Sequence, residues 1–320
     1  MSFNFQKYSG ALNFLMASLL GIAIIYTQLT IFPMLSLIGL FPYILLWVSQ
    51  GWRWTLVSYL VTSVAVWLLF GLPAVLGTMP VIVIIASLLA VFIERKLDDY
   101  RSIFLASMAC LFVLLATIYL EEQISGISMN DALQPLVRDA MENVVAEMQM
   151  MAGEEVGSSL EIQLAGIMVM TWMSQHVPAI MYITALFLVT INYYFASAVL
   201  ARTDALIERK YFSELTMPKM LAGSLAISIL LLLYFGSGQV QLEIIGSNLM
   251  TMSLALVLLN GLSTTAMFFR RRLLNFFVVY LGVIFFGIKE VAIALLIMGA
   301  VDLIADLRGR ITLGGGPDGR

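Results

Sequence analysis

Long apolar runs separated by short polar breaks are the feature that most limits how this chain can fold. Of the 320 residues, 61% are hydrophobic and only 12% are charged, whereas a soluble domain is about a quarter charged. So few charged side chains cannot cover a water-facing surface around so much apolar material. The composition therefore excludes soluble enzymes, nucleic-acid-binding proteins and disordered chains, and it predicts an integral membrane protein with the lipid bilayer as its partner.

Apolar runs of roughly 20 residues can cross the bilayer as helices. We therefore expect an all-α fold, a polytopic transmembrane helix bundle of about ten spans with an extracytoplasmic amphipathic helix. The expected spans are 9–26, 31–48, 55–70, 74–93, 102–120, 178–200, 220–235, 244–269, 273–288 and 291–304. The domains are then a five-helix membrane half (1–120), an acidic helical segment (121–177), a C-terminal membrane half of about five spans (178–305) and a cytoplasmic tail (306–320).

Two regions need a choice between one helix and two. Pro178 is expected to begin a span after an interfacial helix that ends near Val177, because a missing N–H is harmless at a helix start. Residues 273–304 are expected to form a hairpin with Gly287, Lys289 and Glu290 at its outer turn. One continuous helix would place this charged pair inside the hydrocarbon, at a cost of roughly 2.5–3.5 kcal/mol per charge.

The basic residues favour one orientation, because cytoplasmic loops keep an excess of Lys and Arg. With a cytoplasmic N-terminus, 15 of the 17 basic residues lie inside, and Arg138 and Lys289 lie outside. We therefore expect both termini to be cytoplasmic. The basic cytoplasmic loops hold Arg202, Arg209, Lys210, Lys219, Arg270, Arg271 and Arg272. These residues either set the orientation alone or also dock a protein or anionic lipid headgroups.

The largest polar segment, 121–161, carries nine acidic residues and one basic residue. Apolar residues recur at three and four spacing from Met129 to Met148, after a capping pattern at Ser128 and Asp131. The segment is expected to be a helix packed on the outer ends of the bundle or on the membrane surface. Alternatively, it is a lid over an outward-facing site.

Polar residues near the outer ends of the spans are candidates for a solute site. The expected pocket comprises Tyr26, Thr27, Gln28, Trp172, Gln175, His176 and Asn192. The alternatives are a polar helix interruption at His176 and a hydrogen bond between helices at Asn192. Gly10, Ala17 and Gly21 fall along one face of the first span and predict a close contact with another helix, from this chain or from a partner.

Other chemistry finds little support in the sequence. His176 is the only histidine and Cys110 the only cysteine, so a histidine pair, a disulfide within the chain or a thiolate metal cage cannot form. Gly314 to Gly316 lack the Lys that a phosphate-binding loop requires. We expect no enzymatic activity, no catalytic residue, no cofactor and no metal site. Cu(I) handling by outer methionines is a minor alternative, based on Met148, Met150, Met151, Met168, Met170 and Met173.

Several short motifs resemble the uncharacterised YybS-like bacterial membrane proteins. They are Val177-Pro178-Ala179, Ile191-Asn192-Tyr193-Tyr194, Ala201-Arg202, Phe212, Leu215-Thr216-Met217-Pro218-Lys219, and the closing set Gly299, Asp302, Asp306 and Arg308. The resemblance covers about residues 178–310, and it implies a location in the bacterial plasma (inner) membrane. Thr216 and Met217 depart from the Trp-Arg-Leu type sequence that is more typical of this loop.

The YybS-like family is similar, more distantly, to the substrate-binding S components of energy-coupling-factor transporters. The resemblance implies six helices, a cytoplasmic N-terminus, and small residues on the first helix that face an ATP-driven coupling module. It also implies capture of a small solute at the outer face, so a transport-type role is the first functional hypothesis. A membrane organiser that docks partners through its basic cytoplasmic loops is the second.

Overall fold

Every regular element in the part of the chain described by the computed structural model is a helix. The described residues are 10–30, 38–126, 131, 159–203, 210–235, 240–268 and 287–307. The helices are α1 (Gly10–Thr30), α2 (Phe41–Gln50), α3 (Trp52–Phe70), α4 (Leu72–Glu94), α5 (Asp99–Ser125), α7 (Ser159–Thr203), the 3₁₀ turn η3 (Phe212–Glu214), α8 (Met220–Phe235), α9 (Val240–Phe268) and α11 (Ile288–Ala305). The all-α prediction is confirmed for these residues.

Six described helices are long and apolar enough to cross a membrane: α1, α3, α4, α5, α7 and α9. The expected count of about ten spans is not confirmed. In the expected span 31–48, the described helix begins only at Phe41, and α2 has ten residues. In α8 the apolar stretch covers only Met220–Tyr234, and α11 carries Lys289, Glu290 and Asp302 within 18 residues.

Two other expectations fall largely outside the described residues. The amphipathic helix expected near 128–148 is described only at Asp131, so it stays a prediction. The first arm of the expected hairpin, 273–286, is likewise outside. The second arm is described as α11, which follows Gly287 at φ +91°, a backbone angle that favours glycine. The helix therefore begins where the hairpin interpretation places the turn.

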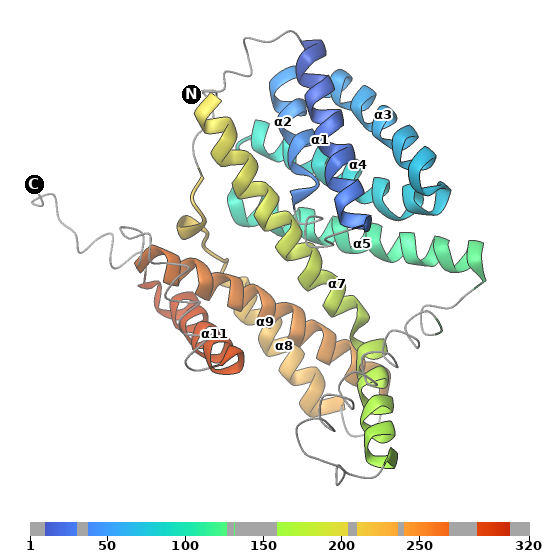
Figure 1. The fold of residues 1–320 in the computed structure, drawn as a ribbon. Helices are drawn as coiled ribbons and strands as arrows, with labels where there is room; N and C mark the ends of the chain where they lie inside the picture. Colours follow the sequence, from blue (N-terminus) through green and yellow to red (C-terminus); the bar gives the residue numbers. More distant parts are fainter. Residues whose placement is uncertain are drawn as a thin grey trace, which may run out of the picture.

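The helices form two groups that are joined by α7 (Figure 1). Helices α1 to α5 pack together, and the C-terminal half of α7 packs mainly against α5. Helices α8 and α11 both pack against α9. Among the described elements, this second group contacts the rest of the chain mainly through α9, which packs against α7 and η3. We call these two sets the N-terminal group (α1–α5) and the C-terminal group (α8, α9, α11).

Helix α7 corrects the expected break at Pro178, because the helix runs without interruption from Ser159 to Thr203 with Pro178 inside it. The Asn248 side chain of α9 explains this continuity. Its amide nitrogen donates to the Gln175 carbonyl at 2.7 Å, and its amide oxygen accepts from the Ala179 N–H at 3.1 Å. Gln175 and Ala179 would bond each other in an ordinary helix, so Asn248 satisfies both groups where proline disturbs the helix.

The outer surface and the interior of the N-terminal group differ as a bilayer requires. Helix α3 exposes Trp52 and Trp54 at one end and Trp67 near the other, which is the arrangement of interfacial aromatic anchors. Inside, hydroxyl pairs link neighbouring helices. They are Ser18 with Ser58 at 2.8 Å, Tyr43 with Thr62 at 2.9 Å and Tyr59 with Ser87 at 3.2 Å. Polar groups within the bundle thus bond one another, since lipid offers them no partner.

Two glycines set the approach of α9 to α11. A Cβ on Gly261 would overlap the Leu295 carbonyl oxygen, and a Cβ on Gly299 would overlap the Val257 carbonyl oxygen. The two backbones therefore touch at this crossing, as in small-residue contacts between membrane helices.

The bridge at Pro178 gives a stability prediction. Asn248→Ala should lower the free energy of unfolding by about 1–3 kcal/mol, because Gln175 and Ala179 lose their partner inside the membrane. Pro178→Ala in the same chain should recover part of this loss, since an uninterrupted helix can bond Ala179 to Gln175 directly. SDS titration of unfolding in mixed micelles measures both effects. An Asn248→Ala protein as stable as wild type would contradict the bridging role.

Candidate functional site

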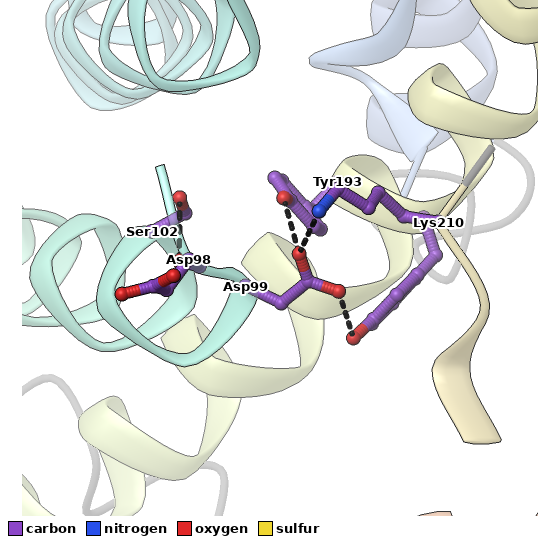
Figure 2. A network of polar contacts seen from close by, with 6 residues as sticks. Asp98, Asp99, Ser102, Tyr193 and Lys210 are labelled. Atoms are coloured by element: carbon purple, nitrogen blue, oxygen red, sulfur yellow. Dashed lines mark hydrogen bonds and ion pairs between the residues drawn. The ribbon is translucent and has the colours of Figure 1, made fainter. Parts of the chain in front are cut away.

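Asp99, in the first turn of α5, is the centre of a polar cluster at one end of the bundle (Figure 2). The Tyr193 hydroxyl donates to Asp99 Oδ1 at 3.0 Å, and the Tyr194 hydroxyl donates to Asp99 Oδ2 at 3.3 Å. The Lys210 ammonium lies 3.3 Å from Asp99 Oδ1. A helix N-terminus also favours a carboxylate, so Asp99 is stabilised by its own helix and by two other segments.

The arrangement of Tyr193 and Tyr194 depends on their position near the end of α7. Adjacent helical residues point about 100° apart, yet both hydroxyls reach one carboxylate because its two oxygens face different directions. The two rings pack edge to face with centroids 5.3 Å apart. Tyr193 is buried, so the pair fixes α7 to α5 with little freedom.

The loop 210–219, which contains η3, ties this cluster to the C-terminal group. Phe212 packs edge to face on Tyr194, with ring centroids 5.6 Å apart. The Ser263 hydroxyl of α9 lies 2.6 Å from the Phe212 carbonyl oxygen and 2.9 Å from that of Leu215. The 210–219 loop therefore contacts both helix groups at the same end of the molecule. We call this end the loop end.

A second buried polar cluster continues from the loop into α9 and α11. Asn260 accepts from the Met217 N–H at 3.3 Å, and its amide nitrogen donates to Asp302 Oδ2 at 3.2 Å and to the Gly299 carbonyl at 3.1 Å. The Thr264 hydroxyl also donates to Asp302 Oδ2 at 3.2 Å. A buried carboxylate needs such donors, and these contacts hold the loop to the α9–α11 crossing.

An open, polar cavity of about 370 Å³ lies beside Asp99. Its lining consists of Asp98, Asp99, Tyr100, Lys210, Glu214 and Thr216. Three carboxylates and one ammonium make its wall net negative. Within the described ranges, no group of three or more His, Cys, Asp or Glu side chains could hold a metal ion.

The residues expected to form one outer pocket lie in three places. The first place is the contact between α7 and α9. The His176 ring lies stacked on Trp172, with centroids 4.6 Å apart, and its Nε2 lies 2.6 Å from the Ser247 hydroxyl. The other ring nitrogen lies 2.8 Å from the Trp172 carbonyl oxygen. His176 is buried, and its Nε2 contact with Ser247 holds α7 to α9, together with the contact of Gln175 to Asn248.

The second place is the C-terminal end of α1. Tyr26 packs on Phe70 with ring centroids 5.8 Å apart, and the Thr27 hydroxyl donates to carbonyls of its own helix. Gln28 lines a cavity of about 190 Å³ that reaches Thr184 and Leu188 on α7. Thr184 lies eight residues, or roughly 12 Å of helix, beyond His176, so Gln28 and His176 belong to different sites.

The third place is the interior between these sites and the loop end. Asn192 is fully buried, and its amide nitrogen donates to the Leu188 carbonyl of the same helix at 2.8 Å. It immediately precedes the tyrosines that hold Asp99. Its motif, Ile191-Asn192-Tyr193-Tyr194, contributed to the family resemblance in the sequence, whereas nothing in the sequence singled out Asp99 or the polar cluster.

The small residues of the first span take different positions. Gly21 is buried against α2, where an added Cβ would overlap the Tyr43 hydroxyl. Ala17 lines a mostly apolar groove of about 190 Å³ between α1, α2 and α7. Gly10 is the first residue of α1. The close approach at Gly21 therefore serves a contact within this chain.

The basic residues also divide. Arg202 and Lys219 are exposed, and Lys210 pairs with Asp99. Arg209 and Arg270 to Arg272 lie outside the described residues. Of the outer methionines, Met168 is exposed, and Met148, Met150 and Met151 lie outside the described residues.

A family model described as "Predicted membrane protein (DUF2232)" matches residues 15–303. The chain belongs to this family. The match includes both helix groups and the Asp99 and Asp302 clusters, so all the contacts described above lie within the family region. No curated protein matches the chain, and no solved structure matches it.

For this DUF2232 protein, the pair Asp99 and Lys210 gives a second prediction. Asp99→Asn removes the charge that Lys210 and two tyrosine hydroxyls share, and it should cost roughly 1–3 kcal/mol of unfolding free energy. Lys210→Met should cost less, because its side chain is 30% exposed whereas that of Asp99 is 13% exposed.

A double-mutant cycle on these two changes should give a coupling energy of roughly 0.5–3 kcal/mol. Asp98 is the matched control, because it is the neighbouring acid and its ion pair is with exposed Arg101. Asp98→Asn combined with Lys210→Met should show less coupling. Equal coupling of Lys210 to Asp98 and to Asp99 would contradict the assigned geometry.

Proposed function

We propose that this multi-pass membrane protein has a transport-type role, in which it captures a small solute and moves its two helix groups relative to each other. The observation that carries the proposal is the joining of the groups through α7 and the 210–219 loop. Transporters commonly work by rigid-body rocking of one helix bundle against another. In this chain, the contact of Asn248 with Gln175 and Ala179 would link the movement of α9 to that of α7.

The loop end would be the closed side in this proposal. Asp99 holds Lys210, and Ser263 of α9 binds two carbonyls of the same loop. Separation of the groups at this end must break contacts of the 210–219 loop with one group or the other. The contact of Asp99 with Lys210 is the one expected to break during this motion, because charged groups regain hydration when they separate.

The topology of the proposal follows the distribution of basic residues. The loop end carries exposed Arg202 and Lys219, so we assign it to the cytoplasm of a bacterium, with both termini on that side. The role is not enzymatic and uses no cofactor. The YybS-like naming and the likeness to S components are part of this interpretation, and they suggest an ATP-driven coupling module as the partner.

A distance measurement tests the motion. Spin labels on exposed residues of the two groups, at Val64 of α3 and Leu233 of α8, in a Cys110→Ala chain, report the separation by pulsed electron resonance. Asp99→Asn should broaden or shift the distance distribution, because the loop end opens more often. Asp98→Asn should leave it unchanged.

A second pair of labels within the N-terminal group, at Val64 and Phe112, is the internal control and should not change in either variant. If Asp99→Asn alters this internal distance equally, the effect is local unfolding, and the two-group proposal is wrong. Unchanged distances between the groups would also contradict it.

A membrane organiser is the second candidate, because the polar cavity of about 370 Å³ opens at the same end as exposed Arg202 and Lys219. In this case, Arg202→Gln with Lys219→Gln should abolish the recovery of partner proteins in affinity purification from membranes. Arg53→Gln is the control, since Arg53 lies over the Trp52 ring on α3. Unchanged partner recovery in the double variant would exclude docking through these two residues.

A further inference from the structure

The cavity beside Gln28 has the features of a site for a small molecule. It lies among α1, α4, α5 and α7, together with the turn before α2. Its described lining is Gln28, Gly39, Leu40, Gly77, Thr78, Val81, Ile82, Cys110, Leu114, Thr184, Ala185 and Leu188. Every one of these residues is uncharged. A charged ligand would lose its hydration here with no opposite charge among them to replace it.

The volume limits the size of the occupant. The cavity measures about 190 Å³, whereas an apolar protein cavity of about 150 Å³ holds one benzene molecule. A single ring with one or two substituent atoms therefore fits, but a ligand of drug size, which needs at least about 300 Å³, does not.

The polar groups of the wall define which hydrogen bonds the occupant can make. The Thr78 hydroxyl donates to the Ala74 carbonyl at 2.7 Å, and the Thr184 hydroxyl donates to the Ile180 carbonyl at 3.0 Å. Each threonine has thus used its only proton and retains lone pairs that accept. Gln28 is half-buried, and its side-chain amide adds a further acceptor and a donor.

We propose that this cavity binds an uncharged, single-ring molecule that donates a hydrogen bond to Thr78, Thr184 or Gln28. This inference deepens the proposed transport role, on which it rests, by naming the class of its solute. It also replaces the larger outer pocket expected from the sequence, since Gln28 alone among those residues lines the cavity.

The test uses the full chain in lipid nanodiscs and three probes of similar size: phenol, toluene and benzoate. Phenol is neutral near pH 7 and donates a hydrogen bond, toluene donates none, and benzoate is charged. Equilibrium dialysis measures the amount bound. Lipid uptake is removed by subtracting the amount bound to nanodiscs of the same lipid without protein.

Gly77→Val is the blocking variant, because Gly77 lines the cavity and a Cβ at this position meets nothing within 4 Å, so the larger side chain causes no clash. Gly223→Val on α8 is the matched control, since its Cβ also meets nothing within 4 Å and Gly223 is not among the lining residues. If Gly77→Val fails to fold, Thr184→Phe at the exposed rim serves as the second blocking variant.

Saturable phenol binding should be at least tenfold weaker in the blocked variant and unchanged in Gly223→Val. Toluene should bind several-fold more weakly than phenol, and benzoate should show no saturable binding. Equal phenol binding in the wild-type and blocked proteins would overturn the site. Benzoate or toluene binding as strong as that of phenol would overturn the assigned chemistry.

The distance measurement described above separates this inference from the proposed function. Binding to the cavity with no relative motion of the two groups would refute transport and leave the site intact. Motion without phenol binding would refute the site alone.

Discussion

The requirement that every backbone polar group inside a membrane finds a partner is the constraint on which this structure depends. It is most demanding at Pro178, where proline interrupts the hydrogen bonding of the longest described helix. Asn248 meets the requirement with one side chain that both donates and accepts. Because the partner comes from α9, the contact that preserves α7 also joins the two helix groups. Without it, α7 would be free to break, and the groups would lose a main connection.

The loop end applies the same rule to charged groups. Asp99 and Asp302 are carboxylates at or near the membrane, and each is surrounded by donors rather than left in lipid. The 210–219 loop lies between them. Its Met217 N–H donates to Asn260, and its Phe212 carbonyl accepts from the Ser263 hydroxyl. The two clusters therefore hold the same loop. Any movement of this loop must change its contacts with both helix groups.

The sequence predicts the long apolar helices well, but it predicts poorly which side chains contact one another. The length of the apolar runs identifies α3, α4 and α5, because a bilayer demands long uninterrupted runs. Pro178 misled the prediction, since its local preference for a helix start was overridden by a side chain 70 positions later. His176 and Gln28 were both expected in one pocket, yet the length of α7 separates them. Asp99 gave no signal, because an acid at a helix start is ordinary until its tyrosine and lysine partners are known.

The crossing of α9 and α11 at Gly261 and Gly299 has a consequence for biogenesis. Asp302 belongs to α11, so its bonds with Asn260 and Thr264 of α9 can form only after the chain has been synthesised through α11. Until then, the Asn260 amide and the Thr264 hydroxyl on α9 lack the Asp302 carboxylate as a partner. A prematurely terminated product would consequently display unsatisfied amides within the bilayer, a state that membrane proteases could distinguish from the completed protein.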